Sequence, residues 1–201
     1  KFKGWFVGDN PSGIFIGVVN SVPGLEVLVS NQGSNDLTYY PGGYATLIEE
    51  DVKYFAVGSS PVGVRVYDLD NDGKNDIITP LSNDITVSYG IIKTDDNFET
   101  PVYLGRGGKQ HTDLIVVNIN RDKDKNNNDL KDLITTNLQD NTISVYVNLG
   151  SRNFAGPYDF PVGQGPQKVI SSDFNNDGCP DLAVMNRSGK TVTLLANTLC
   201  E

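Results

Sequence analysis

Two nine-residue segments rich in oxygen-bearing side chains recur 105 residues apart in this chain. Residues 68–76 read DLDNDGKND, and residues 173–181 read DFNNDGCPD. Both segments carry Asp or Asn at positions 1, 3, 5 and 9, and both have Gly at position 6, where the backbone must turn sharply. Such crowded carboxylates repel one another unless a cation lies among them, and Ca²⁺ accepts six to eight oxygen ligands. The two segments therefore predict calcium sites and an internal repeat.

The repeat extends to the residues around the acidic segments. Each segment lies between short apolar or alternating runs bounded by turn residues, a pattern typical of β-strands. In chain order, the runs of the four units are 16–20 and 26–31; 63–67, 77–79 and 84–89; 114–117, 132–137 and 142–148; 168–172, 182–186 and 190–195. A glycine marker repeats independently at Gly8, Gly58, Gly105 and Gly163. Four units are expected, with boundaries near 9–58, 59–105, 106–163, and 164–201 plus 1–8.

Four short antiparallel strands in each unit of this length are typical of a β-propeller blade. We therefore expect an all-β fold in which residues 1–201 form one domain of four four-stranded blades. The last unit stops after its third strand, while the chain begins with a strand-like run, Phe2–Val7. Joining this run to the last blade would close the ring and leave no open edge. The alternative is an eight-bladed ring completed by two chains.

Residues 66–78 and 172–184 resemble FG-GAP/VCBS repeats, which build the integrin α-subunit propeller and several propeller lectins. The resemblance implies Ca²⁺ held between the first two strands of a blade. In the second unit the implied ligands are Asp68, Asp70, Asp72 and Asp76, with the backbone carbonyl of Lys74. In the fourth unit they are Asp173, Asn175, Asp177 and Asp181, with the carbonyl of Cys179. Two departures are that four units are fewer than the seven usual in the family, and that the first unit keeps only Asn20 and Glu26.

The third acidic loop can be aligned in two frames. The first frame uses Asn118, Asn120, Asp122 and the more distant Asp132 across a six-residue insertion. The second frame uses Asp124, Asn126, Asn128 and Asp132 at the regular spacing. Position 2 is apolar in both regular loops, and the first frame places Ile119 there whereas the second places Lys125. The first frame is therefore preferred, and a third calcium site is possible.

Composition and charge exclude several classes of function. The net charge of −9 argues against nucleic acid, whose phosphates require a basic face. The longest apolar run, 14–19, is interrupted by Gly17, so no membrane span is expected. No basic and apolar leader opens the chain, which indicates a mature or a cytosolic product. His111 is the only histidine, so histidine triads and multi-histidine metal centres are excluded. Paired carboxylates for glycoside hydrolysis remain open.

The two cysteines, Cys179 and Cys200, flank the last predicted hairpin. Its outer ends lie side by side, so either a disulfide joins the cysteines or both remain thiols. A glycosylation triplet, Asn186-Arg187-Ser188, also favours a secreted protein, although such triplets often arise by chance.

The leading functional prediction is a secreted, calcium-binding lectin that does not transform its ligand. Trp5, Tyr39 and Tyr40 are candidate sugar-stacking residues, because tyrosine and tryptophan combine apolar area with a polar tip. The alternative for these side chains is packing within or between blades. The alternative functions are an adhesion module that recognises a protein and an enzyme that acts on polysaccharide. A homo-oligomer is also possible.

Overall fold

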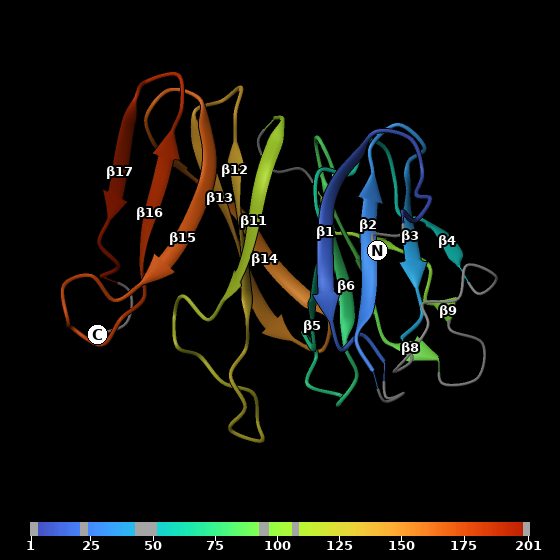
Figure 1. Cartoon of the computed structure of the whole chain (residues 1–201). Coiled ribbons are helices and arrows are strands. Elements are labelled where there is room, and N and C mark those ends of the chain that lie inside the picture. Colours follow the sequence, from blue (N-terminus) through green and yellow to red (C-terminus); the bar gives the residue numbers. More distant parts are fainter. Residues whose placement is uncertain (1–3, 21–23, 43–51, 93–96, 106–108, 199–201) are drawn as a thin grey trace. The chain divides into compact units, whose positions relative to one another are not determined.

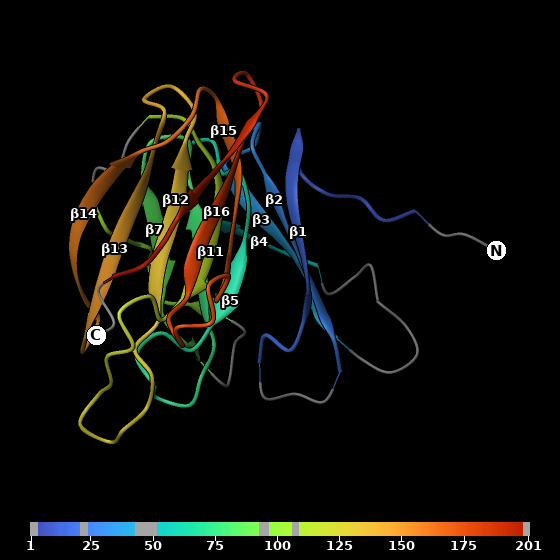
Figure 2. The ribbon, with the colours of Figure 1, turned by 90° about the vertical axis from the view of Figure 1, so that its left-hand side faces the viewer.

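The computed structural model describes residues 4–20, 24–42, 52–92, 97–105 and 109–198. The regular elements in these ranges are β-strands, which form four antiparallel sheets of three or four strands and one two-stranded hairpin (Figures 1 and 2). In the same ranges no helix could cross a bilayer. Contacts divide the chain into two compact units, one of Lys1–Asp68 with Gly73–Tyr103 and one of Leu69–Asp72 with Leu104–Glu201. Each unit is described by itself.

The first unit contains two four-stranded sheets. Sheet 1 runs in chain order through β1 (Pro11–Gly17), β2 (Glu26–Asn31), β3 (Asp36–Tyr40) and β4 (Lys53–Ala56). Sheet 2 has the order β10-β7-β6-β5, made of β5 (Arg65–Tyr67), β6 (Asp76–Pro80), β7 (Ile85–Ser88) and β10 (Val102–Tyr103). A separate hairpin joins β8 (Ile91–Ile92) to β9 (Asn97–Phe98). The core of the unit consists of Val19, Leu28, Leu37, Tyr39, Val57, Val64 and Ile77.

The second unit also contains two sheets, and two strands of sheet 3 have nine residues each. Sheet 3 runs through β11 (His111–Val117), β12 (Asp132–Asn137), β13 (Thr142–Gly150) and β14 (Asn153–Pro161). Sheet 4 has three strands in its described part, namely β15 (Pro166–Ser172), β16 (Asp181–Asn186) and β17 (Thr191–Leu195). Its core consists of Ile119, Ile134, Ile143, Val145, Val169, Leu182 and Val184.

A buried asparagine at the end of the second strand recurs in three of the sheets. Asn31, Asn137 and Asn186 are each 1% exposed or less. Each donates from its side-chain amide to two side-chain oxygens of the third strand; Asn137 Nδ2, for example, donates to Thr142 Oγ1 at 2.8 Å and to Ser144 Oγ at 2.7 Å. The repeat is therefore present in side-chain hydrogen bonding as well as in strand order.

The all-β prediction is confirmed, and the described residues form four sheets of antiparallel strands. The predicted run 132–137 coincides with β12, and 26–31 coincides with β2. His111 is the buried first residue of β11, where it pairs with Asn137. Ring closure stays a prediction.

The expected N-terminal strand is wrong in its described part, because residues 4–8 form no strand. This run contacts sheet 1 instead. The Trp5 ring lies edge-on to Tyr40 at 5.6 Å, the Tyr40 hydroxyl donates to the Phe6 carbonyl, and Gly8 N donates to Thr38 Oγ1. A strand forms only beside a partner edge, and none of these contacts supplies one.

Candidate metal-binding loops

Three loops join the first and second strands of sheets 2, 3 and 4, and they carry the predicted metal ligands. In the loop between β5 and β6, carboxylate oxygens of Asp68, Asp70 and Asp76 lie within 4.8 Å of one another. Asp72 and Lys74, the other predicted ligands, are exposed in the same loop. Oxygens at this separation can share one hard cation.

Backbone geometry explains why the sequence forms this loop twice. Position 4 has a positive φ in both regular loops, 56° at Asn71 and 61° at Asn176. Position 6 is Gly73 or Gly178, each with φ of 85°, a conformation that a side chain would strain. The position-6 N–H then donates to the carboxylate at position 1, with a distance of 2.9 Å to Asp68 Oδ2 or to Asp173 Oδ2.

The third loop follows the first of its two possible frames. In all three loops the N–H of position 5 donates to the side-chain oxygen of position 3; in the third loop Asp122 N lies 3.1 Å from Asn120 Oδ1. The position-2 N–H of Ile119 donates to Asp132 Oδ2 at 2.8 Å, as Phe174 N donates to Asp181 Oδ2 at 3.0 Å. Asn118, Asn120, Asp122 and Asp132 therefore correspond to positions 1, 3, 5 and 9.

The residues of the second frame form a separate turn. Asp124 Oδ1 accepts hydrogen bonds from Asn126 N at 2.8 Å and from Asn128 N at 2.9 Å. The backbone N–H of Asn128 is the main cause that lowers the pKa of the Asp124 carboxyl. Lys123 and Asp129 pair as an isolated bridge at the base of this turn. Most hydrogen bonds of the insertion are thus made within it, and Asn71 Nδ2 also donates to Asp124 and to the Asp129 carbonyl.

Two buried oxygens in the third loop accept no hydrogen bond, namely Asn118 Oδ1 and Asp122 Oδ1. Burying such oxygens without a partner is costly. Burial also raises the pKa of Asp132 to about 6, and the charge of Asp122 adds to that increase. A cation coordinated by these oxygens would satisfy them and offset the repulsion, so the donor set fits a hard metal ion.

The position-9 carboxylate also has a structural role that the sequence did not reveal. Asp132 Oδ1 accepts the N–H of Asn148 at 2.8 Å, and Asp181 Oδ1 accepts that of Asn197 at the same distance. Asp76 accepts Gly90 N in the same way. In the first unit, buried Glu26 accepts Val19 N at 2.8 Å. The carboxylate therefore ties the loop to the end of the third strand in sheets 2, 3 and 4. Glu26 accepts an N–H from its own loop, as Asp132 and Asp181 do, although the first loop lacks a complete ligand set.

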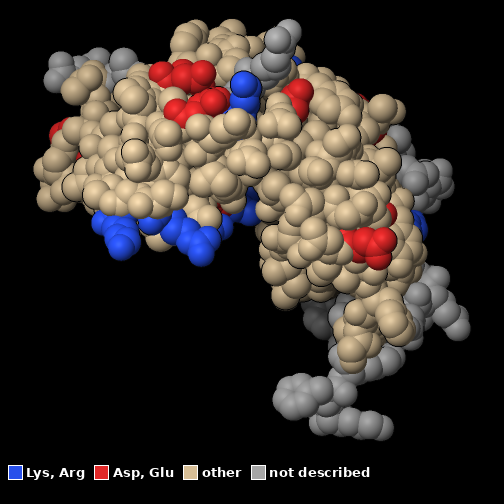
Figure 3. Space-filling model, turned by 90° about the horizontal axis from the view of Figure 1, so that it is seen from above, with Lys and Arg blue, Asp and Glu red and all other residues tan. Residues whose placement is uncertain are grey.

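Arginine and lysine side chains of the protein already form ion pairs with some of the acidic groups. Arg152 Nε lies 2.6 Å from Asp70 Oδ2, so a metal at that oxygen would compete with a guanidinium. Asp129, in the insertion, pairs with Lys131 at 3.0 Å. On the face drawn in Figure 3, acidic residues lie in small separate groups and uncharged residues cover most of the surface.

Two of the three predicted stacking residues are buried. Tyr39 is fully buried and contacts the rings of Phe55 and Phe98, and Tyr40 is 3% exposed. Trp5 packs on Tyr40. The packing alternative is correct for Tyr39 and Tyr40, because their positions in β3 point into packed regions rather than to solvent.

Cys179 is buried and disulfide-bonded. The partner expected for it, Cys200, lies outside the described residues.

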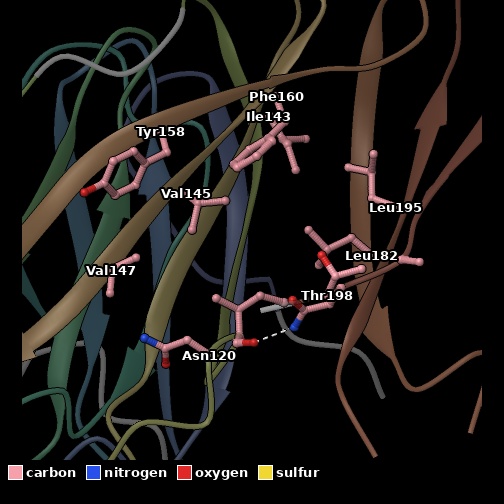
Figure 4. A pocket seen from close by; sticks show the side chains of 12 residues that line it. Asn120, Ile143, Val145, Val147, Tyr158, Phe160, Leu182, Leu195 and Thr198 are labelled. Carbon is pink, nitrogen blue, oxygen red and sulfur yellow. Dashed lines mark hydrogen bonds between the residues drawn. The ribbon is translucent and has the colours of Figure 1, made fainter. Parts of the chain in front are cut away.

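A groove of about 450 Å³ in the second unit was not predicted. Figure 4 shows Val145, Val147 and Tyr158 on one side of it and Leu182 and Leu195 on the other. Its polar groups gather at one end, where Asn197 Nδ2 donates to the Ile119 carbonyl at 2.6 Å. Tyr158 and Phe160 of β14 line the groove and are 51% and 41% exposed. Sequence reasoning missed it because its lining comes from two different sheets, and the strand pattern does not specify how they pack.

The FG-GAP-like repeat model matches residues 124–184, from the third loop to β16. Comparison with curated protein sequences gives no match. Among solved structures, BBS1N in complex with ARL6DN is 10% identical with a TM-score of 0.58, over 92% of this chain and 56% of that one. An auxiliary nutrient binding protein from Bacteroides thetaiotaomicron is 12% identical with a TM-score of 0.62, over 92% and 47%. The V. cholerae biofilm matrix protein Bap1 is 12% identical with a TM-score of 0.50, over 94% and 31%.

The chain thus spans about half the length of BBS1N and of the nutrient binding protein. At these identities the likeness concerns the fold alone. The repeat match and the four sheets agree, and the chain therefore carries an FG-GAP-like repeat within a β-propeller-like fold.

Proposed function

We propose that this chain is a calcium-stabilised, non-catalytic recognition module whose sheets are the blades of a propeller. The observation that carries the proposal is the recurrence of one loop geometry in sheets 2, 3 and 4, with unsatisfied buried oxygens at Asn118 and Asp122 in the third loop. Three loops that share one hydrogen-bonding geometry are better explained by a common ligand than by three unrelated turns.

Calcium would be held by the side chains at positions 1, 3, 5 and 9 of each loop. When bound, it supplies charge neutralisation and rigidity rather than chemistry. The chain itself supplies the frame, because backbone N–H groups hold the position-9 carboxylates Asp76, Asp132 and Asp181. A site prepared in this way loses less conformational entropy on binding.

The groove of the second unit is the proposed recognition surface, and a protein segment with apolar side chains is the proposed partner. Its walls carry Ile143, Val145, Val147, Leu182 and Leu195, which offer few hydrogen-bonding groups. Partly exposed aromatic rings such as Tyr158 are typical of protein interfaces. The BBS1N structure, a complex with ARL6DN, supports a protein partner for this kind of fold.

Carbohydrate is the second candidate. Tyr158 and Phe160 present ring area beside the polar end of the groove, where Asn120, Asn197 and Thr198 lie. A sugar can stack its apolar face on such aromatic rings, and its hydroxyl groups can form hydrogen bonds with the polar side chains.

An extracellular location is proposed on two grounds. Cys179 is disulfide-bonded, and disulfides persist in oxidising compartments. Weak calcium sites fill only where the ion is abundant, as outside cells. Absence of catalysis is proposed because the one histidine, His111, is buried at a strand end.

We also propose that the N-terminal run, of which residues 4–7 are described and form no strand in this structure, becomes the fourth strand of sheet 4 when the propeller closes. The support is that sheets 1, 2 and 3 each have four strands, whereas the described part of sheet 4 has three.

Calcium binding is tested by equilibrium dialysis of the chelator-stripped chain followed by elemental analysis. We expect three bound Ca²⁺ ions per chain, lost on addition of chelator. A stripped chain that takes up no calcium would contradict the proposal.

Partner class is tested by peptide-display selection and a glycan array, each run with calcium and with chelator. We expect selected peptides rich in apolar residues, with binding abolished by Tyr158→Ala together with Phe160→Ala. Tyr103→Ala is the matched control, because Tyr103 is 57% exposed in β10 and outside the groove. Binding only to glycans would favour the second candidate, and product release from polysaccharides would overturn the non-catalytic assignment.

A further inference from the structure

One asparagine joins the third metal-binding loop to the fourth. Asn197 Nδ2 donates to the carbonyl of Ile119, position 2 of the third loop, at 2.6 Å, the bond drawn as a dashed line in Figure 4. The backbone N–H of the same residue donates to Oδ1 of Asp181, position 9 of the fourth loop, at 2.8 Å. Asn197 therefore contacts both loops at once, and all three residues belong to the second unit.

The hydrogen bonds continue to a predicted ligand carboxylate at each end. The Ile119 N–H donates to Asp132 Oδ2 at 2.8 Å, and the Phe174 N–H donates to Asp181 Oδ2 at 3.0 Å. The two position-9 carboxylates are thus joined through the backbone of Ile119 and one asparagine. Both carboxylates are buried, so a bond that breaks there is costly to lose. A shift of one carboxylate is therefore transmitted to the other.

Asn148 makes the same pair of contacts one sheet earlier. Its N–H donates to Asp132 Oδ1 at 2.8 Å, and its Nδ2 donates to the carbonyl of Leu69, position 2 of the second loop, at 2.9 Å. Asn148 and Leu69 are both buried, and both belong to the second unit. The same two contacts at equivalent positions make the asparagine link a property of the repeat.

The equivalent residue of sheet 2 follows a first loop that lacks a complete ligand set, and it carries no such link. Gly90 N donates to Asp76 Oδ1 at 2.8 Å, but glycine has no side chain to reach the preceding loop. A different residue, Asn75, donates to the Val18 carbonyl at 3.0 Å. Among these three sheets, the asparagine link therefore occurs where both of the joined loops carry a predicted ligand set.

We propose that Asn197 couples the third and fourth loops, so that a calcium ion in either loop raises the affinity of the other. An ion that coordinates Asp181 fixes this carboxylate, and through Asn197 it also fixes Ile119 and Asp132. The second ion then meets a loop that is already ordered. Such a coupling is reciprocal by thermodynamic linkage. Asn197 is a positioning residue in this scheme, and the inference rests on the proposed calcium binding.

Repulsion between the two ions does not oppose this coupling. The predicted ligands of the third loop include two carboxylates, and those of the fourth loop include three, namely Asp122 and Asp132, and Asp173, Asp177 and Asp181. One Ca²⁺ therefore brings the third ligand set to a formal charge of zero and the fourth to −1. Two such filled loops do not repel as two bare cations would. The sign of the coupling is then set by the hydrogen bonds.

The test is a calcium titration followed by NMR, because amide resonances report each loop separately. The N–H of Asp122 reports the third loop and that of Asp177 the fourth, since each donates to the side-chain oxygen at position 3 of its own loop. Four forms are compared: the unmodified chain, Asp173→Ala, Asn197→Ala and the double variant. Asp173→Ala removes a predicted ligand of the fourth loop. Asn197→Ala keeps the N–H that holds Asp181 and removes the side chain that reaches the third loop.

We expect Asp173→Ala to weaken calcium binding at the third loop by about fivefold or more, although it removes no ligand from that loop. In the Asn197→Ala background, the same substitution should leave the affinity of the third loop unchanged. Asn197→Asp, which keeps the size of the side chain and loses its donor, should also abolish the dependence. Thr198→Ala is the matched control, because Thr198 lines the same end of the groove, and it should preserve the dependence.

A purely structural role would lower the stability of Asn197→Ala but would leave the third loop dependent on Asp173, and that result would overturn the coupling. Third-loop affinity that is unaffected or increased by Asp173→Ala in the otherwise unmodified chain would also overturn it, while calcium binding itself would stand. Failure of the unmodified chain to take up calcium would overturn the proposed function together with this inference.

Discussion

At the scale of single residues, the ninth loop position serves both the proposed ion and the backbone. Asp132 and Asp181 each receive two backbone N–H groups, one from their own loop and one from a residue sixteen positions further along the chain. Sequence spacing predicted these residues as ligands, because acidic residues at fixed intervals are visible in it. The spacing did not predict the backbone donors of these carboxylates, since every residue type except proline can donate a backbone N–H.

This double role predicts a stability effect without calcium. In chelator, Asp181→Asn should lower the free energy of unfolding by about 1–3 kcal/mol, because the amide can accept at only one of its two polar atoms and leaves a buried N–H unsatisfied. Asp173→Asn should have a much smaller effect, because Asp173 is exposed and water replaces its contacts. Urea denaturation measures both. Equal losses in the two variants would refute the backbone role.

Ion stoichiometry distinguishes the two frames of the third loop. Asp122→Ala should reduce bound calcium by one ion, because its buried Oδ1 lacks any other partner. Asp124→Ala should leave the count unchanged, since that carboxylate is occupied by Asn126 and Asn128. The readout is metal content after dialysis. The reverse result would favour the second frame.

At the scale of elements, the glycine that follows a fourth strand lets the chain pass close to the next sheet. A Cβ on Gly163 would lie 2.5 Å from Asn186 Nδ2 and 2.8 Å from Thr191 Oγ1. The marker glycines were recognised in the sequence by their spacing, and the structure gives the physical reason at this site. The β8–β9 hairpin had no comparable signal, because its strands have two residues each.

Gly163→Ala should therefore destabilise the second unit. Forcing a methyl group against a buried asparagine costs about 1–3 kcal/mol, as overpacking does elsewhere. Gly4→Ala is the control, because a Cβ there meets nothing within 4 Å. Thermal unfolding followed by circular dichroism compares the two, and an unchanged midpoint for Gly163→Ala would show that the neighbouring side chains yield at little cost.

At the scale of the whole molecule, the all-β class and the four sheets could be predicted from periodicity, because each sheet repeats the same strand pattern. Whether the N-terminal run forms a strand could not be predicted in this way. Residues 4–8 have a strand-like composition, yet a strand also requires a partner edge, and composition does not specify one. Burial of Tyr39 and Tyr40 was likewise undecided, since an aromatic residue in a strand suits a core and a binding surface equally well.

Calcium should stabilise the molecule as a whole by mass action. Each site that binds only the folded chain adds about 2.7 kcal/mol when free calcium is a hundredfold above its dissociation constant. The melting temperature should therefore rise with the logarithm of calcium concentration and fall on chelation, as scanning calorimetry would measure. Magnesium, which demands a tighter octahedral site, should stabilise less. A melting temperature independent of calcium would contradict this.

The self-contained turn at residues 123–129 has a practical consequence. Its hydrogen bonds begin and end largely within the turn, and most of its residues are exposed. Foreign sequence placed at such a loop tip is usually tolerated. An affinity tag or a fluorophore attached there would report on the protein or immobilise it, and would leave the sheet edges accessible.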